Sequence, residues 1–539
     1  MAIALMLLFI VCVVIGLWVI MALVRIIFGS AAMWQRFTLY DLRVIGHYLG
    51  TLLMFFAALM AVPLATALFF HEWEPAARYL WSAGIVLVAG CSLRFLRIEP
   101  GRLDRRQALA VTGFAWVVLA LFASIPLYFS GHYATYLDAV FDGVSGLTTT
   151  GASLIVDLDH LSYADNMFRF AMHALGGLGL IVVALSFGLF GRGGGASLFS
   201  SEGRSEHVVP NVVQTTQFIS RITVVIVLLA TAVITALCLF MGMEPTRAFL
   251  NALWVSISGF LTGGFTPMQL SIMYYHSFPL EVVLMILMIL GSISFVLYAE
   301  VWRGRAQMFF RDLETKTMIL WVGVMAFVFT ATMATAPYFY DMLALLRRGA
   351  FMIVSAFTTT GFQVVTSNQI TKVFTNGAFL TLAFIMAVGG SSGSTAGGIK
   401  FSRMGIIFKS IVANVKEALA PDSARVVVDY NHLGRRVLSP QVVKEAMTVF
   451  ILYVVTYVVG ALVGIAHNYE AIPAIFESVA MTSNGGIVTT LATPGMPPTL
   501  ELFYIFQMWA GRLEFVTLLA LIVEVVATIV PRRRAKERP

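Results

Sequence analysis

Ser145-Gly-Leu-Thr-Thr-Thr-Gly151, Ser258-Gly-Phe-Leu-Thr-Gly-Gly264, Ser355-Ala-Phe-Thr-Thr-Thr-Gly361 and Ala480-Met-Thr-Ser-Asn-Gly-Gly486 are four stretches of this chain that read almost alike. Each one ends on a glycine after six residues that are mostly small or polar. An aromatic residue stands four positions before each stretch: Phe141, Trp254, Phe351 and Phe476. A segment that recurs four times at similar intervals predicts four copies of one structural unit.

The composition places these units in a lipid bilayer. The chain is 59% apolar and 12% charged, with a mean hydropathy of +0.87, whereas a soluble domain is about half apolar and a quarter charged. The net charge of +7 does not indicate nucleic acid, because the basic residues gather at one end of the hydrophobic segments, as a cytoplasmic membrane face predicts. The three cysteines lie far apart in apolar runs and predict neither a disulfide framework nor a metal site.

The sequence therefore predicts an all-α, polytopic membrane protein. A spanning helix needs about 20 mostly apolar residues. The segments of that kind are 3–28, 46–70, 77–95, 107–130, 169–190, 216–242, 279–301, 317–338, 374–412, 444–466 and 499–530. The first has no basic residue before it and is longer than a signal sequence, so we interpret it as a retained membrane helix.

A shorter apolar stretch precedes each of the four repeats. These stretches, at about 135–146, 246–259, 344–356 and 471–482, are too short to span and fit re-entrant helices. Counting basic residues places all four repeats on the outer side, with Arg247, Arg347 and Arg348 as the exceptions. The predicted organisation is extra N-terminal helices (1–100), pore repeats 1 (101–205), 2 (206–312) and 3 (313–418), a cytoplasmic hairpin (419–440) and pore repeat 4 (441–539).

A second motif supports the fourfold reading. The helix that follows each re-entrant stretch carries Gly176-Gly-Leu-Gly179, Gly291-Ser-Ile-Ser294, Gly389-Gly-Ser-Ser392 or Gly511-Arg-Leu-Glu514. Irregular backbone at membrane depth is tolerated where it is buried in protein or lines water. Four such loops around one axis can direct carbonyl oxygens at a monovalent cation, and glycine permits the positive φ values that this requires. The alternative is that the small residues merely let helices pack closely.

On these residues the chain resembles the Trk/Ktr/HKT superfamily of potassium transporters, and most closely the bacterial Trk-type membrane subunit, from about residue 46 to the C-terminus. The resemblance implies one pore and a potassium-selective filter, with potassium as substrate and no cofactor in this chain. It assigns ion binding to Thr149, Thr150, Gly151, Thr262, Gly263, Gly264, Thr359, Thr360, Gly361, Asn484, Gly485 and Gly486. Glycine at 151, where sodium-conducting members have serine, implies potassium. A sodium-permeable or cation-coupled carrier of the same fold is the alternative.

The segment Gly389–Lys400 interrupts a predicted span with five glycines, and it resembles the intramembrane gating loop of the family. The gating residues that follow from the resemblance are Gly389, Gly390, Ser391, Ser392, Gly393, Ser394, Thr395, Gly397, Gly398, Lys400 and Arg512. A nucleotide P-loop does not fit, because Ile399-Lys400-Phe401 follows where Lys-Ser/Thr is needed. Arg512 lies roughly 15 Å into a predicted span, where a charge indicates either a functional site or an internal pair, for instance with Glu514.

Several features carry weaker hypotheses. The fourth stretch departs from the family pattern with Ala480 and with Asn484-Gly485, and residues 1–45 lie outside the resemblance. A hairpin with its turn near 431–434 is predicted on the cytoplasmic side. The resemblance implies that this surface meets a cytosolic nucleotide-binding regulatory subunit, and that the chain forms a homodimer. A membrane enzyme would need clustered acids or histidines at one face, and the sequence shows no such catalytic cluster.

Overall fold

The computed structural model describes residues 36–96, 103–186, 212–334, 342–421, 423, 426–513 and 515–529. Within these ranges the regular structure is helical apart from one short hairpin. The predicted span 3–28 lies outside the described residues. Six helices in the described part are long and apolar enough to cross a membrane, and a bent helix pair would make a seventh span.

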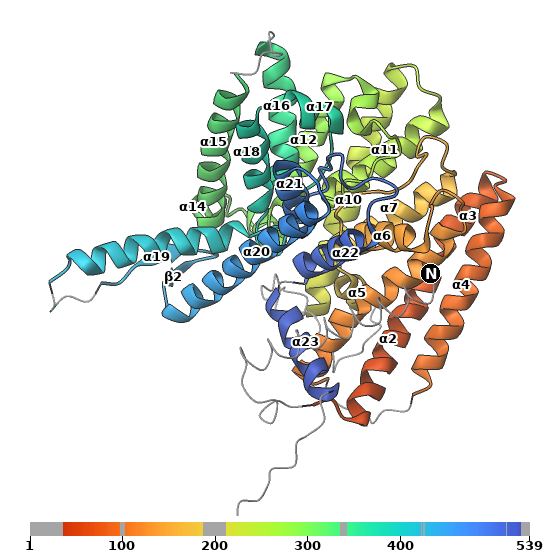
Figure 1. Ribbon diagram of the computed structural model, residues 1–539, viewed down its shortest axis with the longest axis horizontal. Helices are drawn as coiled ribbons and strands as arrows, with labels where there is room; N and C mark the ends of the chain where they lie inside the picture. Colours follow the sequence, from red (N-terminus) through yellow and green to blue (C-terminus); the bar gives the residue numbers. More distant parts are fainter. Residues whose placement is uncertain are drawn as a thin grey trace, which may run out of the picture.

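In the described part of the chain, two spans precede the repeats. α2 (Leu39–Leu59) continues into α3 (Ala61–Phe69) as one span, and α4 (Trp73–Arg94) packs beside it (Figure 1). The helices approach closely at Gly90, where a Cβ atom would lie 3.0 Å from the backbone nitrogen of Met54. A buried ion pair of 2.6 Å between Arg78 and Asp165 then ties α4 to the first repeat.

Each repeat consists of a long first helix, a short pore helix and a second helix in two pieces. Repeat 1 contains α5 (Arg105–Tyr128), α6 (Tyr136–Leu147), α7 (Tyr163–Leu178) and α8 (Leu180–Ser186). Repeat 2 contains α10 (Val212–Phe240), α11 (Pro245–Phe260), α12 (Phe278–Ser292) and α13 (Phe295–Trp302). Repeat 3 contains α15 (Leu313–Met333), α16 (Met342–Phe357), α18 (Asn376–Ala387) and α19 (Phe401–Leu419). Repeat 4 contains α20 (Pro440–Ala466), α21 (Ala471–Thr482), α22 (Pro498–Arg512) and α23 (Phe515–Ile529).

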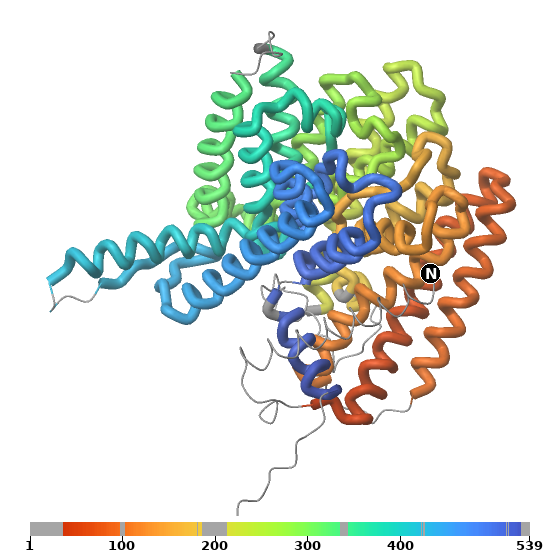
Figure 2. The backbone as a smooth tube through the Cα atoms, viewed as in Figure 1, coloured from red at the N-terminus to blue at the C-terminus, as the bar shows by residue number. Residues whose placement is uncertain are grey.

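The four repeats follow one another around a common centre, as the colour sequence of Figure 2 shows. Helix α7 packs against α11, α12 against α16, and α18 against α21, so each repeat contacts the next. Helix α22 packs against α6, which closes the ring between the last repeat and the first. Short elements η2 (Ser271–Tyr275), α14 (Gln307–Arg311) and α17 (Ser367–Val373) lie in the connections.

The second helix is broken in every repeat, whereas we expected a break only within 374–412. The segments 169–190, 279–301 and 499–530 are therefore not single straight spans, and α12 and α13 meet at 97°. The reason is the first glycine of the second motif, which lies against the carboxyl end of its own pore helix. A Cβ atom on Gly176 would lie 2.7 Å from the carbonyl carbon of Leu147, and one on Gly511 would lie 2.9 Å from that of Thr482. Gly291 meets Phe260 in the same way, whereas a Cβ atom on Gly389 would lie 2.6 Å from Cγ2 of Thr359 and 3.0 Å from the carbonyl oxygen of Phe357.

A hairpin connects repeats 3 and 4 at the place where the sequence predicts one. Strand β1 (Asp429–Asn431) pairs antiparallel with β2 (Arg435–Val437), with Tyr430 opposite Arg436. Helices α19 and α20 pack against each other, with the hairpin beside them, and form an arm that projects away from α2 and α4 (Figure 1).

The glycine contacts make a stability prediction. Gly176→Ala would force a methyl group onto the backbone of Leu147, so we expect a loss of about 1–3 kcal/mol of stability and a clearly lower melting temperature in detergent. Gly84→Ala is the matched control. Gly84 lies in α4 with no atom within 4 Å of its added Cβ atom, so this change should raise stability by up to about 1 kcal/mol. Equal melting temperatures for the two variants would contradict the packing argument.

Candidate ion-binding site

The pore helices point their carboxyl ends at the centre, and the backbone after each one repeats the same conformation. A positive φ occurs two residues before the repeated glycine and again at the glycine itself. The pairs are Thr149 and Gly151 (57° and 85°), Thr262 and Gly264 (49° and 85°), Thr359 and Gly361 (52° and 94°), and Asn484 and Gly486 (52° and 56°). Such alternation turns successive carbonyl groups toward one side, which is the arrangement of a carbonyl-lined cation filter.

The four glycines form a closed ring in which each loop contacts its neighbours. A Cβ atom on Gly151 would lie 2.6 Å from the Cα atom of Gly264, and one on Gly361 would lie 2.9 Å from that of Gly486. A Cβ atom on Gly264 would meet the carbonyl oxygen of Thr360, and one on Gly486 would meet that of Thr150. The order around the ring is therefore 1-2-3-4, and no side chain fits at any of the four positions.

A cavity of about 410 Å³ opens on one side of this ring. All four glycines line its floor, and its wall includes the polar residues that follow them, among them Ser153, Thr266, Gln363 and Thr489. Apart from Arg169, the polar residues that line the cavity are neutral. Neutral hydroxyl, amide and carbonyl groups in a confined space can replace water around a monovalent cation without binding it as strongly as carboxylates would.

The opposite side of the ring is covered by the loop between α18 and α19. Its backbone turns at Gly390, Gly393 and Gly398, where φ is positive, and a parallel bridge between Val388 and Ile399 closes its base. The hydroxyl of Thr262 donates to the hydroxyl of Thr395 (3.1 Å), and the backbone N–H of Gly397 donates to the hydroxyl of Thr359 (2.7 Å). The loop is thus bonded to the ring at the positions that precede the glycines.

Arg512 joins this loop to the first repeat. Its Nη1 donates to the carbonyl oxygen of Thr395 (3.0 Å) and to the hydroxyl of Thr149 (3.2 Å), while Nη2 donates to the carbonyl oxygen of Gly176. The guanidinium also lies 5.8 Å from the ring centre of Trp116. The alternative pairing with Glu514 lies outside the described residues. The structure thus brings the predicted residue Arg512 together with the predicted gating loop.

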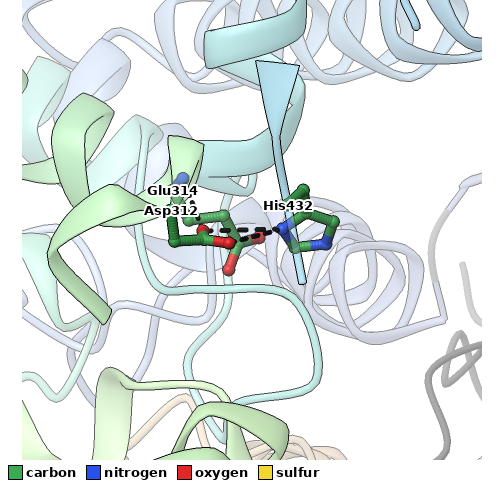
Figure 3. Close-up of side chains that lie close together, drawn as sticks. All are labelled: Asp312, Glu314 and His432. Carbon is green, nitrogen blue, oxygen red and sulfur yellow. Dashed lines mark hydrogen bonds and ion pairs between the residues drawn. The ribbon is translucent and has the colours of Figure 1, made fainter. Parts of the chain in front are cut away.

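A charged cluster anchors the other edge of the loop. Glu314 is buried near the start of α15 and accepts a hydrogen bond from the backbone N–H of Ser392 (2.9 Å). Two residues earlier, Asp312 accepts from Leu433 N–H and lies 3.2 Å from Nδ1 of His432, both in the turn of the hairpin (Figure 3). We call Asp312, Glu314 and His432 the hairpin junction.

The hairpin junction was not predicted, because His432 is 120 residues from Asp312 and the contact is tertiary. Its ligand atoms all lie within 4.8 Å of one another, and two carboxylates with an imidazole are a donor set that first-row divalent cations accept. With or without a cation, the junction connects the hairpin to the intramembrane loop through two neighbouring residues of one helix.

Polar residues in the second helices brace the ring. Arg169 donates to the carbonyl oxygen of Thr266 (3.3 Å), and His173 stacks on Phe265 with ring centres 4.3 Å apart. Gln507 donates to the hydroxyl of Ser478 in the fourth pore helix (2.8 Å). Asn484, which departs from the family pattern, donates to the hydroxyl of Thr150 (2.9 Å) and so links repeat 4 to repeat 1.

Comparison with known proteins agrees with this architecture. The TrkH family model, described as a cation transport protein, matches residues 82–527. An uncharacterized cation transporter of Methanocaldococcus jannaschii is 28% identical over 90% of this chain and 96% of its own length. The Trk system potassium uptake protein TrkH of Escherichia coli is 29% identical over 89% of this chain and 98% of its own length. The crystal structure of the potassium transporter TrkH from Vibrio parahaemolyticus superposes with a TM-score of 0.76 at 23% identity, covering 90% of this chain and 99% of that one.

The family model covers well over half of the sequence, so the chain belongs to the TrkH family of cation transport proteins. The predicted all-α, polytopic membrane fold is confirmed by the superposition with the Vibrio protein.

The hairpin junction predicts a local change that can be measured directly. Asp312→Ala removes the acceptor for Leu433 and the partner of His432, so the amides of the hairpin should exchange with deuterium about tenfold faster. Arg435→Ala is the control, because its ion pair with Asp429 is exposed and should contribute little.

A second exchange experiment, with the chelator EDTA, distinguishes the two ways in which the junction can be held. If EDTA speeds exchange of the unmodified protein as Asp312→Ala does, a bound cation holds the junction. If only the substitution does so, the ion pair and hydrogen bonds hold it. Unchanged exchange in Asp312→Ala would contradict the assignment of the junction.

Proposed function

We propose that this chain is the potassium-conducting membrane subunit of a Trk-type uptake system. The observation that carries the proposal is the closed ring of four glycines with alternating positive φ, between a polar cavity and a glycine-rich loop. Ions would move down their electrochemical gradient through one pore, for which an inside-negative potential supplies about 2.3 kcal/mol per charge per 100 mV.

The choice of potassium over sodium rests on two supports. The ring has glycine at all four positions, including 151, and its ligand groups are neutral. The relatives from Escherichia coli and Vibrio parahaemolyticus are named as potassium transporters. Transport is then the activity of the chain, with potassium as substrate and no catalytic step or cofactor, in a multi-pass protein of the cytoplasmic membrane.

The gate in this proposal is the loop 389–400 together with Arg512. The loop lies against the ring at Thr262 and Thr359, where it would block an ion that leaves the filter. Arg512 adds a positive charge at the same level and holds the loop closed through Thr395. Opening would require these bonds to break and the loop to move aside.

Regulation would enter through the hairpin junction. A cytosolic nucleotide-binding subunit that moves the hairpin would pull on Asp312, and Glu314 on the same helix turn holds Ser392 of the loop.

The arm also offers a surface for a second copy, because α19 exposes the apolar residues Phe408, Ile411, Val415 and Leu419 along one side. Light scattering of the purified protein would reveal whether it is the homodimer that this surface suggests.

The filter is tested by ion flux into liposomes. We expect the unmodified protein to conduct potassium selectively, and Gly151→Ser to leak sodium, because a side chain at φ +85° would displace Gly264. The potassium-to-sodium flux ratio should fall by about tenfold or more, the equivalent of roughly 1.4 kcal/mol of discrimination. Gly242→Ser is the control, since Gly242 has a similar φ of +82° with open space around it. Equal fluxes of both ions through the unmodified protein would favour a sodium-permeable carrier instead.

The gate is tested at Arg512. Arg512→Gln removes the charge and weakens the bonds to Thr395 and Thr149, so potassium flux without a regulator should rise severalfold. Arg512→Lys keeps the charge but lacks the planar fork. An intermediate flux in Arg512→Lys would mean that charge and bonding both contribute. A flux in Arg512→Gln that is equal to or below that of the unmodified protein would refute the role of Arg512 in closure.

A further inference from the structure

The four pore helices differ at one buried position that matters for the filter. The residue nine positions before the filter glycine is Asp142 in repeat 1 and Glu477 in repeat 4, but Val255 in repeat 2 and Met352 in repeat 3. Both acids are buried, with exposed fractions of 1% and 0%. A carboxylate in such a place is stable only if hydrogen-bond donors surround it, so its partners indicate its role.

Asp142 binds the chain just beyond the first filter glycine. Its Oδ1 accepts from the backbone N–H of Leu154 (2.7 Å), and its Oδ2 accepts from the hydroxyls of Ser153 (2.8 Å) and Tyr133 (3.0 Å). Leu154 is three residues after Gly151. The pore helix is therefore bonded to the segment that leaves the filter.

Glu477 makes the equivalent contact in the fourth repeat. Its Oε2 accepts from the backbone N–H of Thr489 (3.0 Å) and from the Thr489 hydroxyl (3.2 Å), while Oε1 accepts from the backbone N–H of Ala492 (3.0 Å). Thr489 is three residues after Gly486, which is the same distance as in repeat 1. Two acids of different length thus reach the same backbone position.

The other two repeats have no carboxylate at this pore-helix position, and neighbouring repeats hold their exits, as the Arg169 guanidinium does when it donates to the carbonyl oxygen of Thr266 (3.3 Å). The corresponding position in repeat 2 is Pro267, which has no N–H to donate. In repeat 3, Gln363 accepts from Ile272 (3.1 Å) through its carbonyl oxygen and donates to the carbonyl oxygen of Val488 (3.2 Å) through its side chain. These bonds run between neighbouring loops, whereas the carboxylate bonds run within one repeat.

We infer that Asp142 and Glu477 are positioning residues for ion selectivity, which fix the exits of filter segments 1 and 4 and so hold the Gly151 and Gly486 carbonyls in register. The inference rests on the proposed function. These are the two repeats that meet where the ring closes between the beginning and the end of the chain. Their contact is direct, through Asn484 and Thr150 and between Gly486 and the Thr150 carbonyl.

The acceptor patterns give the two acids different responses to amide substitution. In Asp142→Asn the remaining oxygen can accept from Leu154, and the new NH₂ group can donate to Ser153 and Tyr133, because hydroxyls both donate and accept. In Glu477→Gln both oxygens face backbone N–H groups, so the NH₂ group must oppose either Thr489 or Ala492. We expect Glu477→Gln to lose about tenfold or more of the potassium-to-sodium flux ratio with total cation flux retained, and Asp142→Asn to change it less than about threefold.

Met352→Leu is the matched control, because it alters the same pore-helix position in a repeat that has no carboxylate. If Glu477→Gln is not recovered as folded protein, Asp142→Ala against Asp142→Asn makes the same comparison, with the loss expected in Asp142→Ala alone. The inference would be overturned if Glu477→Gln kept the potassium-to-sodium flux ratio of the unmodified protein, or if Met352→Leu lost as much of that ratio as Glu477→Gln does. The proposed function fails separately, if the unmodified protein itself does not conduct potassium in preference to sodium.

Discussion

The contact between a glycine of each second helix and the carboxyl end of its pore helix is the constraint on which the rest of this structure depends. A pore helix that stops inside the membrane leaves its last carbonyl groups without helical partners, and lipid supplies none. Gly176 and Gly511 allow the second helix to approach these ends so closely that a methyl group would overlap the backbone. The close approach bends or breaks the second helix, and the break in turn creates the polar segments below the filter.

The loop 389–400 is the extreme case of that break. Repeats 1, 2 and 4 interrupt their second helices over a few residues, whereas repeat 3 inserts a turn-rich segment between α18 and α19. It lies beneath the ring, where it contacts repeat 2 through Thr262, its own repeat through Thr359 and repeat 4 through Arg512. A fourfold architecture thus acquires one unequal element, and that element is the gate in the proposed function.

Local patterns predicted a large part of this arrangement. The first and fourth pore helices, expected at about 135–146 and 471–482, occupy Tyr136–Leu147 and Ala471–Thr482, because a short apolar run before a glycine-rich stretch is a local property. The breaks in 169–190 and 279–301 were missed, since hydropathy stays high across them and their cause is a tertiary contact. The hairpin junction was missed for the same reason. The break in 499–530 falls at Arg512-Leu513-Glu514, whose charges were interpreted as a site within one continuous span. Asp142 and Glu477 could have been found by aligning the four pore helices on their filter glycines, which reveals an acid in two apolar helices.

In the proposed function, selectivity and gating share one set of residues, the threonines before the ring glycines. Thr149, Thr262 and Thr359 adopt positive φ, which costs a β-branched residue about 1–3 kcal/mol. Glycine would remove that strain, yet each threonine uses its hydroxyl: Thr149 accepts from Arg512, Thr262 bonds Thr395, and Thr359 accepts from Gly397. All three bonds lead to the loop or to the arginine that holds it. The strained backbone of the ring is therefore stabilised best when the loop is in place, so under the proposed function a movement of the loop would also alter the ring that selects the ion.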